Sequence, residues 1–297
     1  MMSIGTTPIR SALGLGDSVI RIDTPDDGRF YRLSSGVELP SVTSILDGIR
    51  NLGLERWRAS YVQRGLLNIQ AQVLSIDDIS NVLSGPDRVA QEAAKLGSRV
   101  HAAIDEYLSG GGFSCSDTED PLLEGAMAAF MKWRSHPRFK DWVYLESETA
   151  VYNAGPEFAF AGTVDAIFQD PDSDLWIVDW KTSGGLYQSM FAQVSAYAYA
   201  LEDMLSTQLP NTFSNSNGNG HGSSKLSNVN VRSMVVRFCK EYPITDGVPD
   251  RTQPKAFNGR VHYAISDEDF DSTDKLLLFQ ACYNLRGHDR VKGRYIR

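Results

Sequence analysis

The chain of 297 residues contains 37 acidic and 29 basic side chains, so its net charge at neutral pH is −8. This balance argues against a protein that covers nucleic acid with a broad basic surface, although local basic patches can still guide a strand into a site. A hydrophobic content of 42% supports a sizeable core in one large domain or two small ones. No apolar run approaches the roughly 20 residues that a membrane-spanning helix needs, so we expect no membrane partner.

The N-terminus and the cysteines exclude several further classes. Residues 1–16 hold one basic residue, Arg10, and no apolar core with a cleavage site, so we expect an unstructured leader on a soluble, intracellular protein. That protein would be cytoplasmic in a prokaryote or virus, and mitochondrial or nuclear in a eukaryote. Cys115, Cys239 and Cys282 form no C-x-x-C motif, and the chain has no G-x-x-x-x-G-K-[ST] loop. We therefore expect neither a zinc ribbon, nor a redox pair, nor an ATP-driven motor.

The first half of the chain is expected to be mostly helical. Strands at 19–22 and 30–33 flank a turn-rich segment, and Ser41 is a typical N-cap for a helix at 42–49. Helices are further predicted at 54–67, 76–83, 86–108 and 122–133, the strongest three-and-four spacing of apolar residues lying in 86–108. A glycine-rich acidic loop at 110–120 separates the last two of these helices.

The second half alternates strands with helices. Strands are predicted at 143–152, 158–168, 175–181, 229–239 and 259–265, and helices at 189–205 and 267–285. Residues 209–227 are rich in Asn, Ser and Gly and form an expected low-complexity insert. The order predicts an α/β fold with a mixed central β-sheet flanked by helices, in which an N-terminal strand and helical region at 17–140 precedes a core at 141–297.

Three charged residues stand on two neighbouring strands of this pattern. Residues 175–181 read Leu-Trp-Ile-Val-Asp-Trp-Lys, so Asp179 and Lys181 share one face, roughly 7 Å apart along the strand. The preceding strand carries Asp165, and the polar turn at 169–174 brings the second strand back against the first. A hairpin of this kind can place both carboxylates on one side of the sheet. The alternative is a hairpin with a surface Asp–Lys pair, but a charged pair at the end of so apolar a strand is uncommon.

Two carboxylates this close repel each other and resist losing water, and a divalent cation removes both problems. Hard oxygen ligands suit Mg²⁺ or Mn²⁺, and Mg²⁺ is usually held by one or two carboxylates together with substrate phosphate. Such an ion can polarise a phosphodiester and orient a water. The Lys181 ammonium could position or activate that water, or stabilise the charge that develops.

Four stretches occur in the same order as in a known nuclease group. They are Pro40-Ser-Val-Thr-Ser-Ile-Leu46, Gly97-Ser-Arg-Val-His101, the hairpin with Asp165, Asp179 and Lys181, and Gln193-Val-Ser-Ala-Tyr197. Together they resemble the PD-(D/E)xK nuclease superfamily, and within it the RecB-like branch with its phage and mitochondrial exonucleases. The resemblance spans about residues 29–201. It implies a restriction-endonuclease-like core and a metal-dependent DNA exonuclease that acts on single-stranded DNA or DNA ends in repair, recombination or genome maintenance.

The resemblance also implies a role for each residue of the site. Asp165 and Asp179 would hold the metal together with His101 and the backbone carbonyl of Trp180, and Lys181 would be the catalytic base or an electrostatic partner. His101 lies at the margin of an apolar helical stripe, where a lone histidine is usually just half-buried. The carboxylate pair favours a metal contact instead, and a histidine ligand favours Mn²⁺ over Mg²⁺. Asp105, one turn later, is expected to face solvent.

Further residues are expected to support the site. In relatives an acidic residue before the hairpin assists catalysis, and Glu148 is the candidate, although it could simply pair across strands on a solvent face. Gln193 and Tyr197 share one helix face. By resemblance Gln193 faces the metal and Tyr197 faces a phosphate or the lysine, whereas the alternative makes Tyr197 an ordinary core residue.

Candidate contacts to DNA are Arg56 and Arg58 in a basic stretch near residue 60, and Thr182 and Ser183 directly after the lysine. The basic stretch could equally be solvated surface. Two other functions stay open: a nuclease-like fold that binds nucleic acid or protein without catalysis, and a restriction-type endonuclease. The intact Asp, Asp and Lys set argues against the first, and the lack of a visible recognition module argues against the second. The oligomeric state is not indicated by the sequence.

Overall fold

The computed structural model describes residues 19–24, 28–47, 52–69, 75–111, 120–156, 158–208, 229–249 and 255–295. The predicted leader at 1–16 and the insert at 209–227 lie outside these residues, as does most of the expected loop at 110–120. Within the described part, helices alternate with strands largely as the sequence predicts.

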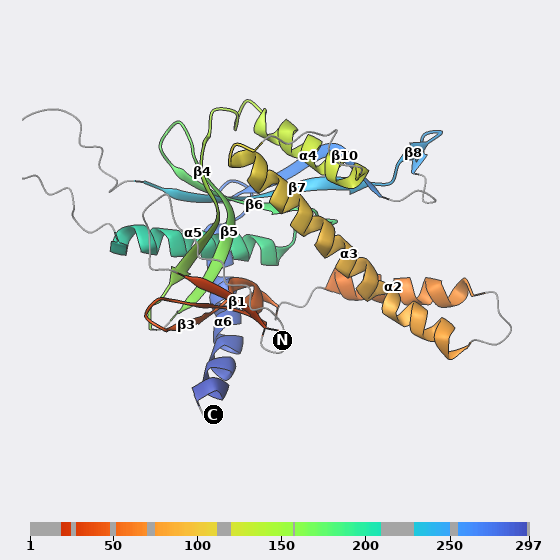
Figure 1. Ribbon diagram of the computed structural model, residues 1–297, viewed down its shortest axis with the longest axis horizontal. Coiled ribbons are helices and arrows are strands. Elements are labelled where there is room, and N and C mark those ends of the chain that lie inside the picture. The colour runs from red at the N-terminus through yellow and green to blue at the C-terminus, as the bar shows by residue number, and fades with distance from the viewer. Residues whose placement is uncertain are drawn as a thin grey trace, which may run out of the picture.

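A five-stranded mixed sheet forms the centre of the fold, with strand order β10-β7-β6-β5-β4 (Figure 1). Its strands are β4 (Val143–Asn153), β5 (Phe160–Gln169), β6 (Leu175–Lys181), β7 (Val231–Glu241) and β10 (Ala256–Ile265). The neighbours β6 and β7 run parallel, and the other pairs are antiparallel. The predicted α/β fold with a mixed central sheet is confirmed.

Two small sheets accompany the central one. The strands β1 (Ile20–Thr24), β2 (Gly28–Arg32) and β3 (Glu38–Pro40) form an antiparallel sheet near the N-terminal end of the described chain. The strands β8 (Ile244–Thr245) and β9 (Val248–Pro249) form a short hairpin between β7 and β10.

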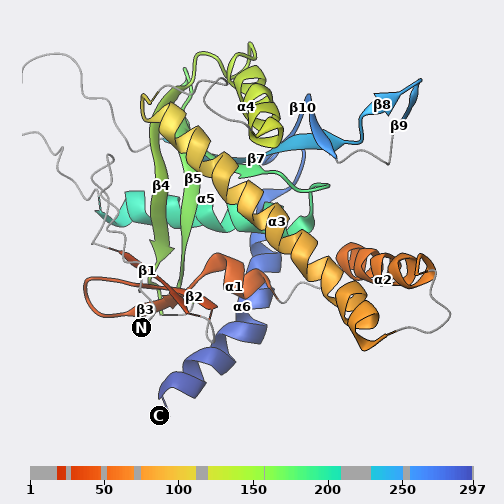
Figure 2. The same cartoon turned by 45° about the vertical axis from the view of Figure 1, so that its right-hand side comes forward.

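Helices cover both faces of the central sheet and enclose two large apolar cores and one small one. On one face α5 (Gln188–Gln208) packs with α1 (Val42–Leu46) and α6 (Ser272–Tyr295). On the other face α3 (Ile76–Leu108) packs with α4 (Pro121–Arg134). The remaining helix, α2 (Leu52–Leu67), packs on the first part of α3 (Figures 1 and 2). Because α6 begins at Ser272, the predicted start at residue 267 is wrong: the preceding residues form a bridge between Ser266 and Phe270.

Helix α3 is one continuous element, which corrects the prediction of separate helices at 76–83 and 86–108. Its start is fixed by a capping box, in which the Ser75 hydroxyl accepts from the Asp78 amide and the Asp78 carboxylate accepts from the Ser75 amide. Pro86 lies inside the helix, where it removes one backbone hydrogen bond. Gly85 and Pro86 are buried, and Gly85 faces the ring of Tyr61 on α2. Packing against α2 therefore holds the helix together at a position where local propensity favours a break.

The hairpin of β5 and β6 has the predicted alternation. Ala166 pairs with Val178 and Gln169 with Leu175, so Asp165 and Asp179 come next at the open end of the ladder. The loop is tied by Asp170, whose carboxylate accepts from the amides of Asp172 and Asp174 and from the indole of Trp176. Along β6 the odd-numbered apolar residues join the core under α5, and Trp176, Val178 and Trp180 join the core under α3 and α4.

Helix α5 lies so close to β5 that only glycine fits at one position. A β-carbon added at Gly162 would lie 2.2 Å from Cε1 of Tyr197, which is far inside van der Waals contact. Gly162 and Tyr197 are both buried, so neither has open space into which it can move. The glycine therefore determines where the Tyr197 ring, and the helix that carries it, sits above the sheet.

Replacing Gly162 with alanine should lower the free energy of unfolding by about 2 kcal/mol or more, because the added methyl overpacks a closed core. Urea denaturation measures the change. Gly184→Ala is the matched control, since the nearest atom to its added methyl is 3.9 Å away. We expect it to stay within about 1 kcal/mol of the parent. Equal stabilities for the two variants would contradict this account of the α5 contact.

Candidate active site

Helix α3 crosses the open end of the β5–β6 hairpin and brings His101 to it. The imidazole Nε2 lies 2.9 Å from the carbonyl oxygen of Trp180, and Nδ1 lies 3.4 Å from Oδ1 of Asp165. The other oxygen of Asp165 accepts a hydrogen bond from the Trp180 amide at 2.8 Å. The histidine, the first aspartate and the Trp180 carbonyl are thus brought together as the sequence predicts.

A candidate metal site is formed by His101, Glu148 and Asp165. One ligand atom from each residue lies within 4.8 Å of the ligand atoms of the other two. His101 and Asp165 are half-buried, whereas Glu148 is exposed at the rim. One imidazole nitrogen and two carboxylates are a donor set that Mn²⁺ accepts readily and Mg²⁺ tolerates. The residues present therefore fit a divalent cation.

Asp179 and Lys181 form a buried ion pair beside this cluster. The side chain of Asp179 is only 1% exposed, and its Oδ2 lies 2.6 Å from Nζ of Lys181. Its Oδ1 accepts a hydrogen bond from Nε2 of Gln193, which also donates to the Tyr197 hydroxyl. Gln193 and Tyr197 thus reach the site from α5, and Tyr197 is at the same time a buried core residue. Asp179 is not one of the three clustered residues, so its place among the metal ligands stays a prediction.

The close charges move the pKa values in this site in different directions. Burial raises the pKa of Asp179 to about 6, although the neighbouring Lys181 ammonium opposes the shift. Burial also acts against the charged forms of Asp165 and Lys181, but the charge of His101 lowers the pKa of Asp165, and Asp179 raises the pKa of Lys181. Burial alone would lower the pKa of His101, and the Asp165 carboxylate outweighs it and raises the pKa. The Asp165 carboxylate therefore stabilises the protonated form of the imidazole, and Asp179 stabilises the charged form of the lysine.

Glu148 reaches the cluster through an irregular strand. The register of β4 against β5 shifts between Tyr144 and Glu146. Glu148 itself has a φ of +50°, in the left-handed region that is unfavourable for any residue with a β-carbon. Desolvation and the Asp165 carboxylate raise the pKa of Glu148. Glu148 thus combines an unfavourable backbone conformation with a carboxylate whose charged form is disfavoured, and it lies beside His101 and Asp165. Such a combination is typical of functional positions.

Asp105 does not face solvent as the sequence predicts. It is half-buried and accepts a hydrogen bond from the hydroxyl of Ser147, which also lies 2.7 Å from the Tyr144 hydroxyl. Because β4 is the edge strand that lies against α3, Asp105 meets this strand rather than water. The contact ties the residue before Glu148 to the helix that carries His101.

Replacing Glu148 with asparagine should separate strain from function, because asparagine tolerates a left-handed backbone and carries no charge. We expect the metal-free variant to gain about 1 kcal/mol of stability and to lose most of the Mn²⁺-dependent rise in melting temperature. Ser173→Asn is the control, since Ser173 has a φ of +72° in the exposed hairpin loop. It should gain similar stability and keep the full metal response. An unchanged Mn²⁺ response in the Glu148 variant would remove this residue from the metal site.

The predicted DNA contacts are placed in two different regions. Thr182 lies beside α3, since a β-carbon added at Gly97 would come within 3.5 Å of its hydroxyl, and Ser183 donates to the Gly185 carbonyl in the turn after β6. Arg56 and Arg58 are exposed on α2, where the Arg58 guanidinium lies 2.7 Å from Asp87. The structure thus brings Thr182 and Ser183 next to the site and leaves Arg56 and Arg58 on a separate helix pair.

Arg237 is a cation beside the site that sequence reasoning missed. Parallel pairing of β6 with β7 makes Arg237 the direct partner of Lys181. Its guanidinium donates to the Gly184 carbonyl, and its Nε is buried without an acceptor among the described residues. A strand more than 50 residues away supplies this neighbour. The sequence offers no signal for it, because the register of a parallel pair is not readable from spacing.

Comparison with known proteins agrees with this geometry. Residues 118–220 match the PD-(D/E)XK nuclease superfamily. The matched segment contains Asp165, Asp179, Lys181, Gln193 and Tyr197, and the mixed sheet flanked by helices is consistent with the PD-(D/E)XK fold. The match suggests a nuclease that uses divalent metal ions.

A solved structure, the crystal structure of SSO0001, is similar over 80% of this chain and 87% of that chain, with 10% identity and a TM-score of 0.28. No curated protein matches the sequence. In the described part of the chain, no helix combines the length and the apolar character needed to cross a bilayer.

Proposed function

We propose that the protein is a metal-dependent deoxyribonuclease of the RecB-like type. It would act as an exonuclease on single-stranded DNA or DNA ends in repair, recombination or genome maintenance. One observation carries the proposal: the buried Asp179–Lys181 pair lies at the end of the hairpin that also presents Asp165 to His101 and Glu148. The superfamily match over 118–220 supports the same chemistry. The preference for single strands or ends, and the biological role, rest on the sequence resemblance.

The metal would be Mg²⁺ or Mn²⁺, held by His101, Glu148 and Asp165, with Asp179 and the Trp180 carbonyl as further oxygen donors. When bound, such an ion polarises the scissile phosphodiester and lowers the pKa of an attacking water. The Trp180 amide holds Asp165 through one carboxylate oxygen and leaves the other oxygen directed toward His101. This orientation is fixed by the backbone, so the ligand geometry does not have to form when the substrate arrives.

Lys181 is the residue that would act on the reacting groups. Its ammonium is held 2.6 Å from Asp179 at the end of β6 and could orient the water or stabilise the negative charge of the transition state. Gln193 supports this arrangement, because it donates both to Asp179 and to the Tyr197 hydroxyl from α5. Thr182, Ser183 and Arg237 lie near the end of β6 and would contact the phosphates next to the scissile bond. Arg56 and Arg58 on α2 would contact the DNA strand farther from the scissile bond.

Single substitutions should separate metal binding from chemistry. Lys181→Ala should lower cleavage of DNA at least about 100-fold, since one electrostatic donor of a transition state contributes on that order, while the Mn²⁺-dependent rise in melting temperature persists. Asp165→Ala should lose both cleavage and the metal response. Asp179→Ala should also abolish cleavage. Cleavage at the parental rate by the Lys181 and Asp179 variants would show that the site assignment is wrong.

The form of the substrate and the metal requirement can be tested together. With Mn²⁺ we expect degradation of end-labelled linear single-stranded DNA, no cutting of covalently closed circles, and complete loss of activity with excess chelator. Cutting of the circles would favour a restriction-type endonuclease. Binding of DNA without any cleavage, at all metal concentrations, would favour the non-catalytic alternative.

A further inference from the structure

Helix α2 and the first part of α3 form an arm that projects from the side of the sheet (Figures 1 and 2). The two helices meet at glycines. A β-carbon added at Gly65 would lie 2.7 Å from Cγ1 of Val82, and one added at Gly85 would lie 2.5 Å from Cε1 of Tyr61. The helix axes can therefore approach closely, and longer side chains rise on either side of the contact.

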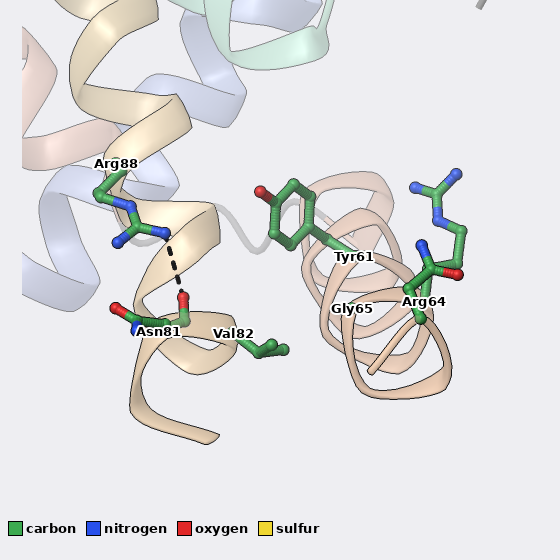
Figure 3. Close-up of a pocket in the computed structure, with 7 residues that line it drawn as sticks. Tyr61, Arg64, Gly65, Asn81, Val82 and Arg88 are labelled. Carbon is green, nitrogen blue, oxygen red and sulfur yellow. Dashed lines mark hydrogen bonds between the residues drawn. The ribbon is translucent and has the colours of Figure 1, made fainter. Parts of the chain in front are cut away.

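One side of this contact is an open cavity of about 510 Å³, whose lining is part polar and part apolar (Figure 3). Tyr61 and Arg64 line it from α2, Asn68 from the turn directly after α2, and Asn81 and Arg88 from α3. Tyr61 projects from α2 toward α3, Arg88 lies along α3 beside Asn81, and the Arg64 side chain lies on the side of α2 away from α3 in this view. A cavity of this size is large enough for a ligand with the bulk of a nucleotide.

Among the residues that the structure describes, the two arginines of this cavity have no acidic partner. Arg64 donates to the Ser60 carbonyl and Arg88 to the Asn81 carbonyl, each at 3.2 Å, and neither forms an ion pair within the described ranges. Both are exposed. By contrast, Arg58 on the other side of α2 is paired with Asp87 at 2.7 Å. In a chain with eight more acidic than basic side chains, two unpaired guanidiniums at one cavity indicate a binding site for an anion.

We infer that this cavity binds the phosphate backbone of a nucleic-acid strand outside the active site. Guanidinium groups match phosphate oxygens in charge and geometry. The hydroxyl of Tyr61 and the amides of Asn68 and Asn81 add neutral donors and acceptors for the sugar and for further phosphate oxygens. The inference rests on the proposed function, because it assigns the substrate of the nuclease site to a second place on the chain.

Helix α3 connects the cavity rigidly to the candidate active site. Arg88 and His101 are 13 residues apart on the same helix, beyond Pro86, which corresponds to roughly 20 Å along the axis. Thirteen residues are about 3.6 turns, so the two side chains leave nearly opposite sides of the helix and a strand that joins them has to pass around it. At roughly 3.4 Å per stacked nucleotide, at least about six nucleotides are needed to reach both places.

The test is DNA binding by the metal-free protein, measured by fluorescence anisotropy with a labelled single strand of about 20 nucleotides. Arg64→Ala/Arg88→Ala should bind at least about tenfold more weakly, because two charge-assisted contacts are lost. The magnitude of the slope of log affinity against log salt should fall by about 1.4, since each phosphate contact to a single strand contributes about 0.7. Lys140→Ala/Arg260→Ala is the control, since it removes two exposed positive charges elsewhere and changes the net charge equally. It should bind within about twofold of the parent.

Three outcomes decide the inference. Parental affinity in the arginine double variant, with an unchanged melting temperature, would overturn it. An equal loss in the control variant would also overturn it, because net charge alone would then explain the effect. Displacement of DNA from the parent by inorganic phosphate at constant ionic strength, down to the affinity of the double variant, would show a phosphate-ion site instead.

Failure of the inference and failure of the proposed function are distinguishable in these experiments. Binding without metal does not depend on catalysis, so the arm can contribute to affinity even if the parent never cleaves DNA. A parent that cleaves DNA, together with a double variant that binds and cleaves normally, would leave the nuclease assignment intact and remove only the arm from substrate binding.

Discussion

The candidate site depends on burying a carboxylate, Asp179, between apolar residues of β6. An isolated buried charge costs several kcal/mol, so Asp179 is tolerable only with compensating partners. Lys181 supplies the opposite charge from the same strand, and Gln193 supplies a hydrogen bond from the helix packed above it. These partners are also groups that the proposed chemistry uses. The interaction that makes the carboxylate tolerable in the fold therefore also holds the reactive groups in place before any substrate binds.

The sequence predicts those parts of the site that are local in the chain. The alternation in β6, the polar turn at 169–174 and the small residues of α5 are visible in short windows, and they predict the strand that carries Asp179 and Lys181 and the helix that carries Gln193. The helix that carries His101 is also predicted from its apolar spacing, whereas the role of His101 in the site rests on the carboxylate pair and on the resemblance. The same local reasoning predicts the central sheet, since each of its strands has its own pattern of apolar residues.

The sequence fails where contacts between distant segments decide the result. Local rules place a break at Pro86, yet burial against α2 keeps α3 continuous. Asp105 lies against an edge strand that its helical pattern does not reveal, and Arg237 becomes a neighbour of Lys181 through parallel pairing. Glu148 has a left-handed backbone conformation, which a glutamate within a strand pattern does not predict. Each case is a long-range contact overriding a short-range preference, which is where prediction from a single sequence is weakest.

The parallel pairing of β6 with β7 has a further consequence for how the chain can be divided. The segment that matches the superfamily ends at residue 220, whereas β7 begins at Val231. A fragment trimmed to the matched segment would leave β6, the strand with both Asp179 and Lys181, as an open sheet edge with unpaired amides and carbonyls. Such an edge invites strand addition by other molecules and aggregation. The smallest autonomous folding unit around these residues must therefore extend through β7, beyond residue 220, where the matched segment ends.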